Sequence, residues 1–365
     1  MRISHTEIYR FSIPTEPFVI ATGTMHYAQN VLIRIHTDNG IYGVGECSAF
    51  PMIVGESQET CLAMAKEFAK ILVGKDPLDI PERMNDLLGY AAHNSTIKSA
   101  FDMALFDIAA KAAGQPLYAF LDGEKRTIET DMTIGIDSPG AMAETAAELR
   151  EKGCNIIKIK LGKEVHEDIE RVKQIREAVG ADILLRLDAN QGWGFDEALF
   201  ALGALEQYNI QFCEQPMRTW YDDRLPELKA NSPIPIMADE SVYNHHDARK
   251  LIQSASVDYL NIKFSKSGGI LEAQKIHEIA LQTGTKCMIG GMLESRIALS
   301  ANLHFALASP NVVFFDMDSC LLGHLIDPVV GGLQYTGYFV DAPDTPGIGA
   351  DADPKFLESC EKWLV

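Results

Sequence analysis

Hydrophobic and polar residues follow different patterns in the two parts of this chain, and the change comes near residue 125. Before it, residues 7–13 and 30–37 are β-branched or alternate in polarity, and Asp38-Asn39-Gly40 is a turn sequence typical of a hairpin. This pattern predicts a three-stranded antiparallel meander ending near Cys47. Apolar spacing then becomes helical over residues 58–72, 79–88 and 95–113, with Asn94-Ser95 as the expected cap of the third helix. Residues 1–125 are therefore expected to form an α+β capping domain.

Two segments of this first region lack a regular pattern. Residues 17–28 are polar and rich in turn formers, and residues 49–57 contain Pro51 and Gly55. Both are expected to be mobile loops. Whether they close over a substrate is left open by the sequence.

From residue 126 onward, short apolar runs alternate with helical segments. The runs are residues 127–136, 155–161, 183–188, 210–214, 234–239, 259–264, 286–289 and 312–317. Eight strand and helix units over residues 126–322 predict a (β/α)8 barrel more simply than an open doubly wound sheet. Residues 323–365, rich in proline and glycine, are expected to pack back on the capping domain.

Composition narrows the classes of function. The chain has 365 residues, 47% of them hydrophobic, and a formal net charge of -19, which argues against binding to nucleic acid or to an anionic membrane surface. Its first residues lack the apolar core of a signal peptide. Its seven cysteines are scattered without a CxxC pair, which favours a reducing cytoplasm over a disulfide framework. Chemistry on a small molecule is the function class that remains.

Polar residues stand at the ends of nearly all the predicted strands, where a barrel carries its active site. They are Thr133, Lys158, Lys160, Asp188, Glu214, Asp239, Lys263, Asp316 and Asp318. Asp188, Glu214 and Asp239 end three consecutive strands and should converge at the barrel mouth. Three carboxylates in one place require a cation, and ligation by oxygen alone suits Mg²⁺, with Mn²⁺ as a possible substitute.

The lysines suggest what such a site does. Lys158 and Lys160 lie two residues apart, so they share one face of a strand, and mutual repulsion favours loss of a proton from one of them. A lysine pair of this kind usually lies on the protein surface. Here, however, Lys263 should lie opposite the pair, four strands away in a ring of eight. A carbon acid held between them can lose a proton to one lysine and regain it from another, while the metal and an ammonium stabilise the enediolate. Nearby cations are expected to lower the lysine pKa values.

These residues carry a family resemblance that spans nearly the whole chain. The motifs are Lys158-Ile159-Lys160, Asp188-Ala189-Asn190, Glu214-Gln215-Pro216, Asp239-Glu240-Ser241 and Asn261-Ile262-Lys263, followed by Lys266-Ser267-Gly268-Gly269. The set resembles the enolase superfamily, muconate-lactonizing-enzyme subgroup. Asp316-Met317-Asp318 resembles the motif with which dipeptide epimerases hold the α-ammonium group of their substrate.

The resemblance implies a role for each residue. It makes Lys160 and Lys263 the two acid/base residues, Lys158 a cation that steadies the substrate, and Thr133 a substrate contact. It also suggests that backbone groups at Gly291 and Leu293 line the dipeptide site. It implies a Mg²⁺-dependent epimerase, expected as a homo-oligomer, that inverts the C-terminal residue of an Ala-Xaa dipeptide.

L-Ala-D/L-Glu from murein turnover is the leading substrate, and a hydrophobic dipeptide is the close competitor. An acidic side chain should meet a cation, yet residues 17–26 and 49–55 contain no lysine or arginine. Arg296 or Lys266 could serve instead. If it does not, Lys266 is expected to be a loop residue that supports the site from behind. His245-His246 is expected to be a polar pair in a loop.

Two alternatives stay open at this point. One is another enzyme of the subgroup, such as a muconate cycloisomerase, an o-succinylbenzoate synthase or an N-acylamino acid racemase. None of their substrates carries an ammonium group that would need both Asp316 and Asp318. The other is a barrel without catalysis that binds an anion, which predicts no metal dependence and no need for two lysines.

Overall fold

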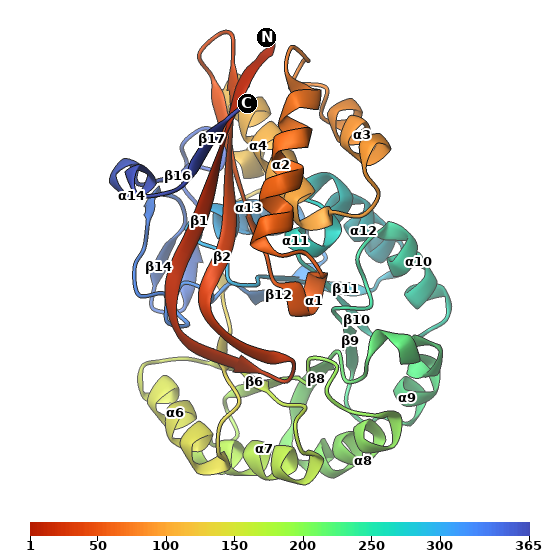
Figure 1. The fold of residues 1–365 in the computed structure, drawn as a ribbon. Helices are drawn as coiled ribbons and strands as arrows, with labels where there is room; N and C mark the ends of the chain where they lie inside the picture. The colour runs from red at the N-terminus through yellow and green to blue at the C-terminus, as the bar shows by residue number, and fades with distance from the viewer.

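An antiparallel sheet formed by both ends of the chain builds one side of the molecule. The computed structural model describes residues 1–365, with β1 (Ile3–Ile20), β2 (Gly23–Thr37) and β3 (Tyr42–Ser48) forming the expected meander. The last strand, β17 (Lys362–Leu364), pairs with β1, so the sheet order is β17-β1-β2-β3. The two termini therefore lie close together (Figure 1).

The prediction of a loop over residues 17–28 is wrong. Strands β1 and β2 continue through this segment as a long hairpin, with Phe18 opposite Met25 and Ile20 opposite Gly23. The apolar run Phe18-Val19-Ile20, one aromatic and two β-branched residues, favours a strand, and the flanking turn formers obscured this signal. The hairpin curves from the sheet down beside the barrel (Figure 1).

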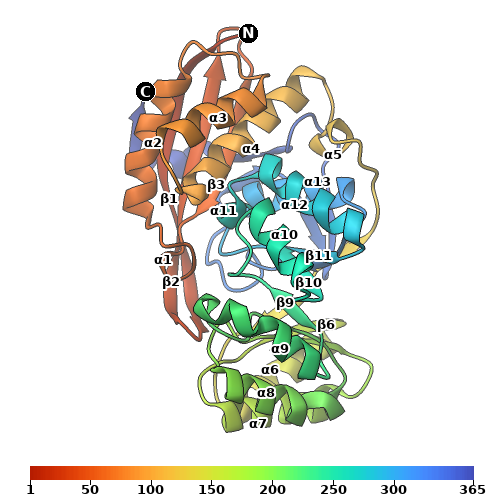
Figure 2. The ribbon, with the colours of Figure 1, turned by 90° about the vertical axis from the view of Figure 1, so that its right-hand side faces the viewer.

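Helices cover one face of this sheet and connect it to the barrel (Figure 2). The helix α4 (Ser95–Ala112) packs so closely on β3 that a Cβ atom at Gly43 or Gly45 would collide with its backbone oxygens. Asn94 precedes α4 as expected but makes no cap with its side chain; Glu56 accepts hydrogen bonds from the Thr96 and Ile97 amides instead. The helices are α1 (Pro51–Val54), α2 (Gln58–Leu72), α3 (Ile80–Tyr90), α4 (Ser95–Ala112) and α5 (Leu117–Phe120).

Eight parallel strands form the barrel, which confirms the predicted fold class. Neighbouring strands in the barrel are also consecutive in the chain. The Asp131 amide donates to the Phe315 carbonyl at 3.1 Å, which joins the first strand to the last. The strands are β5 (Met132–Ile134), β6 (Ile156–Lys160), β7 (Leu184–Asp188), β8 (Ile210–Glu214), β9 (Ile236–Ala238), β10 (Tyr259–Ile262), β11 (Lys286–Gly290) and β12 (Val312–Asp316).

A helical segment follows each of the first seven barrel strands. These are α6 (Pro139–Glu151), α7 (Val165–Val179), α8 (Phe195–Leu205), α9 (Leu225–Asn231), α10 (His245–Gln253), the pair α11 (Phe264–Ser267) and α12 (Ile270–Thr283), and α13 (Arg296–Ala308), with short 3-10 turns at Glu206–Tyr208 and Thr219–Arg224. After β12 the chain instead enters short strands: β13 (Val329–Gly331) pairs with β16 (Ala350–Ala352), and β14 (Gln334–Thr336) with β15 (Phe339–Asp341). The strand β15 also pairs with β4 (Ile128–Glu129), so the first predicted run is divided between two sheets. The last helix is α14 (Pro354–Glu358).

The barrel interior is layered, because residues two apart on a strand point to the same side. Phe212, Met237, Met288 and Phe314 fill its lower part as a separate buried cluster. Two residues further along their strands stand Glu214, Asp239 and Asp316. Apolar side chains thus close the bottom of the barrel, and charged ones stand toward the mouth.

No helix is both long and apolar enough to span a membrane.

Glu46 of β3 joins the capping sheet to the barrel. Its carboxylate is fully buried and accepts hydrogen bonds from the Ser295 amide (2.9 Å) and hydroxyl (2.6 Å) and from the Ala298 amide (3.1 Å), at the start of α13. The Asn30 side chain donates to it at 2.7 Å. One carboxylate therefore fixes a barrel helix against two strands of the other sheet.

We expect Glu46→Ala to destabilise the protein by about 3 kcal/mol or more, because it leaves several buried donors without an acceptor, each at a cost of roughly 1–3 kcal/mol. Urea unfolding followed by fluorescence measures the change in midpoint. The matched control is Glu59→Ala, whose carboxylate is exposed beside Arg10 and should leave the midpoint nearly unchanged. Equal midpoints for the two variants would contradict this account of the junction.

Candidate active site

Strand register sets the predicted site residues side by side in the barrel. Thr133 lies beside Lys158 on neighbouring strands, and Lys160 lies beside Asp188, which in turn lies beside Glu214. The regular period of the strands points these side chains into the lumen. The order of residues in the sequence thus becomes an order around the barrel mouth.

Lys158 is the centre of the buried charges. Its ammonium is fully buried and lies 2.7 Å from Glu214, 2.8 Å from Asp316 and 3.4 Å from Asp188. Burial opposes a charge on this group, but the three carboxylates outweigh it and hold the pKa of Lys158 well above its usual value. Lys158 therefore remains a cation.

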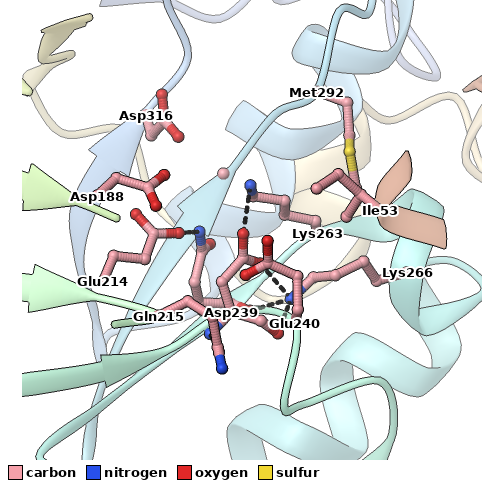
Figure 3. A network of polar contacts seen from close by, with 12 residues as sticks. Ile53, Asp188, Glu214, Gln215, Asp239, Glu240, Lys263, Lys266, Met292 and Asp316 are labelled. Carbon is pink, nitrogen blue, oxygen red and sulfur yellow. Dashed lines mark hydrogen bonds and ion pairs between the residues drawn. The ribbon is translucent and has the colours of Figure 1, made fainter. Parts of the chain in front are cut away.

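Lys160 and Lys263 stand on opposite sides of the same space. Lys160 Nζ lies 2.6 Å from Asp188 Oδ2, and Lys263 Nζ lies 2.8 Å from Asp239 Oδ2. Figure 3 shows Asp188, Glu214 and Asp316 on one side and Lys263 reaching in from the other. The strands that carry the two lysines, β6 and β10, are four apart in the ring of eight.

Nearby cations were expected to lower the pKa values of the lysines, but the pKa of Lys263 is raised in the structure. Burial would lower its pKa, but Asp239 and Glu214 outweigh burial and raise it. Conversely, burial would raise the pKa of Asp188, and Lys160 and Lys158 hold it below its usual range. Lys263 is thus held charged by two of the carboxylates that were predicted to bind the metal.

The three predicted metal ligands do not converge fully. Asp188 and Glu214 share Lys158, whereas Asp239 also pairs with Lys266 at 2.5 Å, and the three do not place their oxygens within 4.8 Å of one another. The buried oxygens Glu214 Oε2 and Asp239 Oδ1 nevertheless accept no well-formed hydrogen bond, although each lies beside an ammonium. Burial and the neighbouring Asp188 raise the pKa of Glu214 to about 7. Buried carboxylate oxygens that lack hydrogen bonds fit a hard divalent cation.

Gln215 holds the ends of β8 and β9 together, a role that sequence reasoning missed. Its side-chain oxygen accepts hydrogen bonds from the amides of Asp239 (2.9 Å) and Ser241 (3.2 Å), and its nitrogen donates to the Met217 carbonyl. Its φ angle of 36° lies in the left-handed region that non-glycine residues rarely adopt. The Glu-Gln-Pro motif gives no signal for this conformation, because a residue before proline usually has an extended backbone.

The basic residues considered as partners of an acidic substrate lie outside the cavity. Lys266 is buried on α11 and donates to the Asp239 and Asn261 carbonyls behind the site. Arg296 pairs with Asp327 at 2.7 Å and with carbonyl groups of the C-terminal segment. Neither of them lines the space between Lys160 and Lys263. His245 begins α10, with Nδ1 2.5 Å from Glu272.

The cavity between Lys160 and Lys263 has apolar walls above the charges. These walls come from the hairpin, the α1 turn and the loops after β11 and β12: Phe18, Ile20, Phe50, Ile53, Met292 and Leu322. Its polar lining consists of Thr133, Lys160, Asn190, Asp239, Lys263, Gly291, Asp316 and Asp318. Figure 3 shows Ile53 and Met292 close to Lys263. The only cationic side chains in this lining are those of Lys160 and Lys263.

Gly291 and Leu293 differ in position. Gly291 lines the cavity, and its amide donates to the Asp316 carbonyl at 3.0 Å. Leu293 does not line it: its amide donates to Ser48 Oγ and its carbonyl accepts from Asn30. The backbone of Leu293 therefore joins the barrel to the capping sheet.

The β9–α10 loop holds the α1 turn in place. The Tyr243 hydroxyl donates to the Ile53 carbonyl at 2.7 Å, across 190 residues of sequence. Ile53 lines the cavity, and Tyr243 follows Asp239 by four residues. This hydrogen bond links an apolar wall of the cavity to the strand end that carries Asp239.

A second group of carboxylates lies on the other side of Lys158. Asp131, Asp316 and Asp318 each place an oxygen within 4.8 Å of the other two. Arg186 lies 2.7 Å from Asp131, and Asp318 accepts a hydrogen bond from the Thr133 amide at 2.6 Å. Sequence reasoning named Asp316 and Asp318 but missed Asp131, which stands just before β5, and Arg186 of β7.

Comparison with known proteins places this site in a family. Residues 5–122 match the mandelate racemase / muconate lactonizing enzyme N-terminal domain, and residues 141–356 match the enolase C-terminal domain-like family. The D-Ala-D/L-Ala epimerase of Cytophaga hutchinsonii is 43% identical over 370 residues, covering 100% of both chains. The L-Ala-D/L-Glu epimerase of Bacillus subtilis is 37% identical over 357 residues, 96% of both chains.

Solved structures agree with the sequence matches. The dipeptide epimerase of C. hutchinsonii, complexed with Mg and the dipeptide D-Ala-L-Val, superposes with a TM-score of 0.98 over 100% of both chains. Relatives at this identity are named epimerases, so the chain is an isomerase of amino acid derivatives. The chain belongs to the mandelate racemase / muconate lactonizing enzyme family of the enolase superfamily.

Proposed function

We propose that this protein is a Mg²⁺-dependent dipeptide epimerase that inverts the α-carbon of the C-terminal residue. The observation that carries the proposal is the placement of Lys160 and Lys263 on opposite sides of one cavity whose wall also holds Asp316 and Asp318. Two lysines suit proton transfer at both faces of one carbon, and two carboxylates suit an ammonium group. The charged groups of the cavity thus suit the chemistry of both ends of a dipeptide.

The metal site would be formed by Asp188, Glu214 and Asp239. A bound Mg²⁺ would supply positive charge in place of the lysines that now pair with these carboxylates, and would draw electron density from the substrate carboxylate. Lys158 remains an ammonium beside the same carboxylates and stabilises negative charge that develops on the substrate.

Proton transfer then belongs to the two lysines. One of them, as the neutral amine, removes the α-proton, and the substrate becomes an enediolate. The other, as the ammonium, returns a proton to the opposite face, which gives the opposite configuration. Apolar side chains around the cavity exclude water from this step.

The apolar walls favour a hydrophobic or small side chain at the inverted residue. A glutamate side chain would be buried among Phe18, Ile53, Met292 and Leu322 without a cation of its own, which is costly. The Cytophaga relative was solved with D-Ala-L-Val, whereas the Bacillus relative is named for glutamate. L-Ala-D/L-Glu from murein peptides is therefore the second candidate substrate.

Asp316 and Asp318 also weigh against the other reactions of the subgroup. Cycloisomerases, o-succinylbenzoate synthases and N-acylamino acid racemases act on substrates without a free ammonium to meet these two carboxylates. A binding protein without catalysis would not need lysines on two sides of the cavity. The dipeptide reaction accounts for both features.

We also propose the wider setting of the enzyme. Residues 1–125 would act as a capping domain, residues 126–322 as the catalytic barrel, and residues 323–365 as a segment that returns to the cap. Seven free cysteines suit a reducing cytoplasm. A homo-oligomer is the proposed assembly, and Mn²⁺ is a possible substitute for Mg²⁺.

The proposal is tested by hydrogen exchange at the α-carbon. In D₂O with Mg²⁺, wild type should incorporate deuterium into Ala-Xaa dipeptides of both configurations at the C-terminal residue. Lys160→Ala and Lys263→Ala should each lose epimerisation by about 10²-fold or more, the usual contribution of an acid/base group. Each variant should retain exchange with one configuration, since one lysine remains.

Mass spectrometry and chiral chromatography provide the measurement, and Lys275→Ala, exposed on α12, is the control. Exchange restricted to acids that are not dipeptides would reject the function.

A second test addresses the side chain. Wild type should use Ala-Val or Ala-Leu with a kcat/KM at least about tenfold above that for Ala-Glu, because an unpaired buried carboxylate is unfavourable. Ile53→Arg should shift this ratio toward Ala-Glu. Val54→Arg is the matched control, since Val54 is on the same turn but lines a separate cavity with Leu88 and His93. A preference for Ala-Glu in wild type would reverse the choice between the two substrates.

A third test addresses the Tyr243 hydroxyl. Tyr243→Phe removes one hydrogen bond worth about 0.5–1.5 kcal/mol and should loosen the turn that carries Ile53. We expect KM for hydrophobic dipeptides to rise by roughly 2–10-fold while kcat changes little. Tyr221→Phe, exposed on the 3-10 turn Thr219–Arg224, provides the control. If kcat fell while KM stayed constant, the hydroxyl would have a different role.

A further inference from the structure

Three carboxylates meet at the wall that would hold the amino end of the dipeptide, and only two side-chain cations accompany them. Lys158 lies 2.8 Å from Asp316 and Arg186 lies 2.7 Å from Asp131, whereas no cationic side chain pairs with Asp318. All three carboxylates are buried, with exposed fractions of 6% or less. The cluster therefore has one negative charge more than its two cations balance.

Asp131 lies behind the cavity wall. Asp316 and Asp318 line the cavity, but Asp131 does not, and its side chain is fully buried. Its Oδ2 accepts from Arg186, and its Oδ1 accepts no hydrogen bond at all. An unpartnered carboxylate oxygen in a dry site is unfavourable, so this position calls for a proton or a cation nearby.

We propose that Asp131 is a positioning residue for the ammonium site, and that binding of the dipeptide exchanges one proton held by the three carboxylates for the substrate's ammonium group. This inference rests on the proposed function. The proton leaves a carboxyl O–H of the cluster and passes to solvent, and the incoming ammonium takes over its charge. Asp131 acts through Asp316 and Asp318 and does not itself touch the substrate.

The surrounding charges agree with this exchange. Burial and Asp316 raise the pKa of Asp131 to about 6, against the attraction of Arg186 and Lys158. Burial, Asp316 and Asp131 likewise raise the pKa of Asp318. The other titratable neighbours stay neutral, because burial raises the pKa of the Cys154 thiol to about 12 and holds the pKa of the Tyr335 hydroxyl well above its usual value. Lys160 and Lys263 act on Asp316 from across the cavity.

The sign of the pH effect follows from linkage. Asp131, with its pKa near 6, is protonated below about pH 6 in the free protein and not when the ammonium is bound, so binding weakens as pH falls through 6. A group with this pKa changes the apparent Kd about tenfold between pH 7 and pH 5. The α-amino group and the α-carboxylate of the ligand titrate outside this window.

The experiment uses L-Ala-Aib, a dipeptide whose C-terminal α-aminoisobutyrate has no α-proton and cannot be epimerised. Calorimetry on the full-length protein with Mg²⁺, in buffers of different ionisation enthalpy, gives Kd and the number of protons released. We expect Kd to be about tenfold weaker at pH 5 than at pH 7, with close to one proton released at pH 5. N-acetyl-L-Ala-Aib, which lacks the ammonium, reports any pH effect that comes from the metal ligands, and it should release no proton from the cluster.

Asp131→Asn keeps the shape of the side chain and removes its charge. Arg186 then acts on Asp316 and Asp318, so the variant should bind L-Ala-Aib more weakly at pH 7, and its Kd should change less than about threefold between pH 7 and pH 5. The matched control is Asp107→Asn in the capping domain, a fully buried carboxylate paired with Lys111 at 2.6 Å, which should retain the wild-type pH dependence.

If Asp131→Asn fails to fold, the inference is tested by comparing the binding of L-Ala-Aib and of its N-acetyl derivative to the wild-type protein. Equal pH dependence for L-Ala-Aib and its N-acetyl derivative, or a wild-type pH dependence retained in Asp131→Asn, overturns the inference. In those cases deuterium exchange with natural dipeptides still supports the proposed function. Absence of both binding and exchange overturns the proposed function and this inference together.

Discussion

Balance of buried charge is the constraint on which the barrel mouth depends. Lysines at positions 158, 160 and 263 stand among carboxylates in a space where water is largely excluded, and an unpaired charge there would cost several kcal/mol. Each ammonium is therefore matched by at least one carboxylate within 3 Å. The same arrangement can exchange partners, because a bound cation can replace an ammonium beside a carboxylate if the displaced lysine gives up its proton.

Strand geometry explains why so much of this site could be predicted from the sequence. Side chains alternate with a period of two, and parallel strands in register bring their ends to one rim. Lys158 and Lys160 share a face for the first reason, and Asp188 and Glu214 are neighbours for the second. The first rule is local to a strand, and the second needs only a predicted parallel barrel, so both can be applied to a single sequence.

Features that depend on contacts far apart in the sequence could not be predicted in this way. The hairpin over residues 17–28 is stabilised by pairing between its two arms, which its turn-forming composition concealed. Asp131 stands just before its short strand, and only the barrel brings it to Arg186, which is 55 residues away. Tyr243 is an ordinary loop tyrosine until its hydroxyl meets Ile53. The direction of the Lys263 pKa shift likewise depends on which carboxylate the folded chain sets beside it.

The two halves of the chain supply different parts of the cavity. Barrel strands supply the charged groups, whose positions are fixed by backbone hydrogen bonds, whereas the hairpin and the α1 turn supply much of the apolar wall. Hydrogen bonds at Glu46 and Tyr243 join the parts of the chain that carry these two sets of residues. A change in the hairpin or the turn can therefore alter which side chain is accepted without disturbing the lysines. Because the charged groups must remain balanced as a set, specificity can change more readily in the cap than in the barrel.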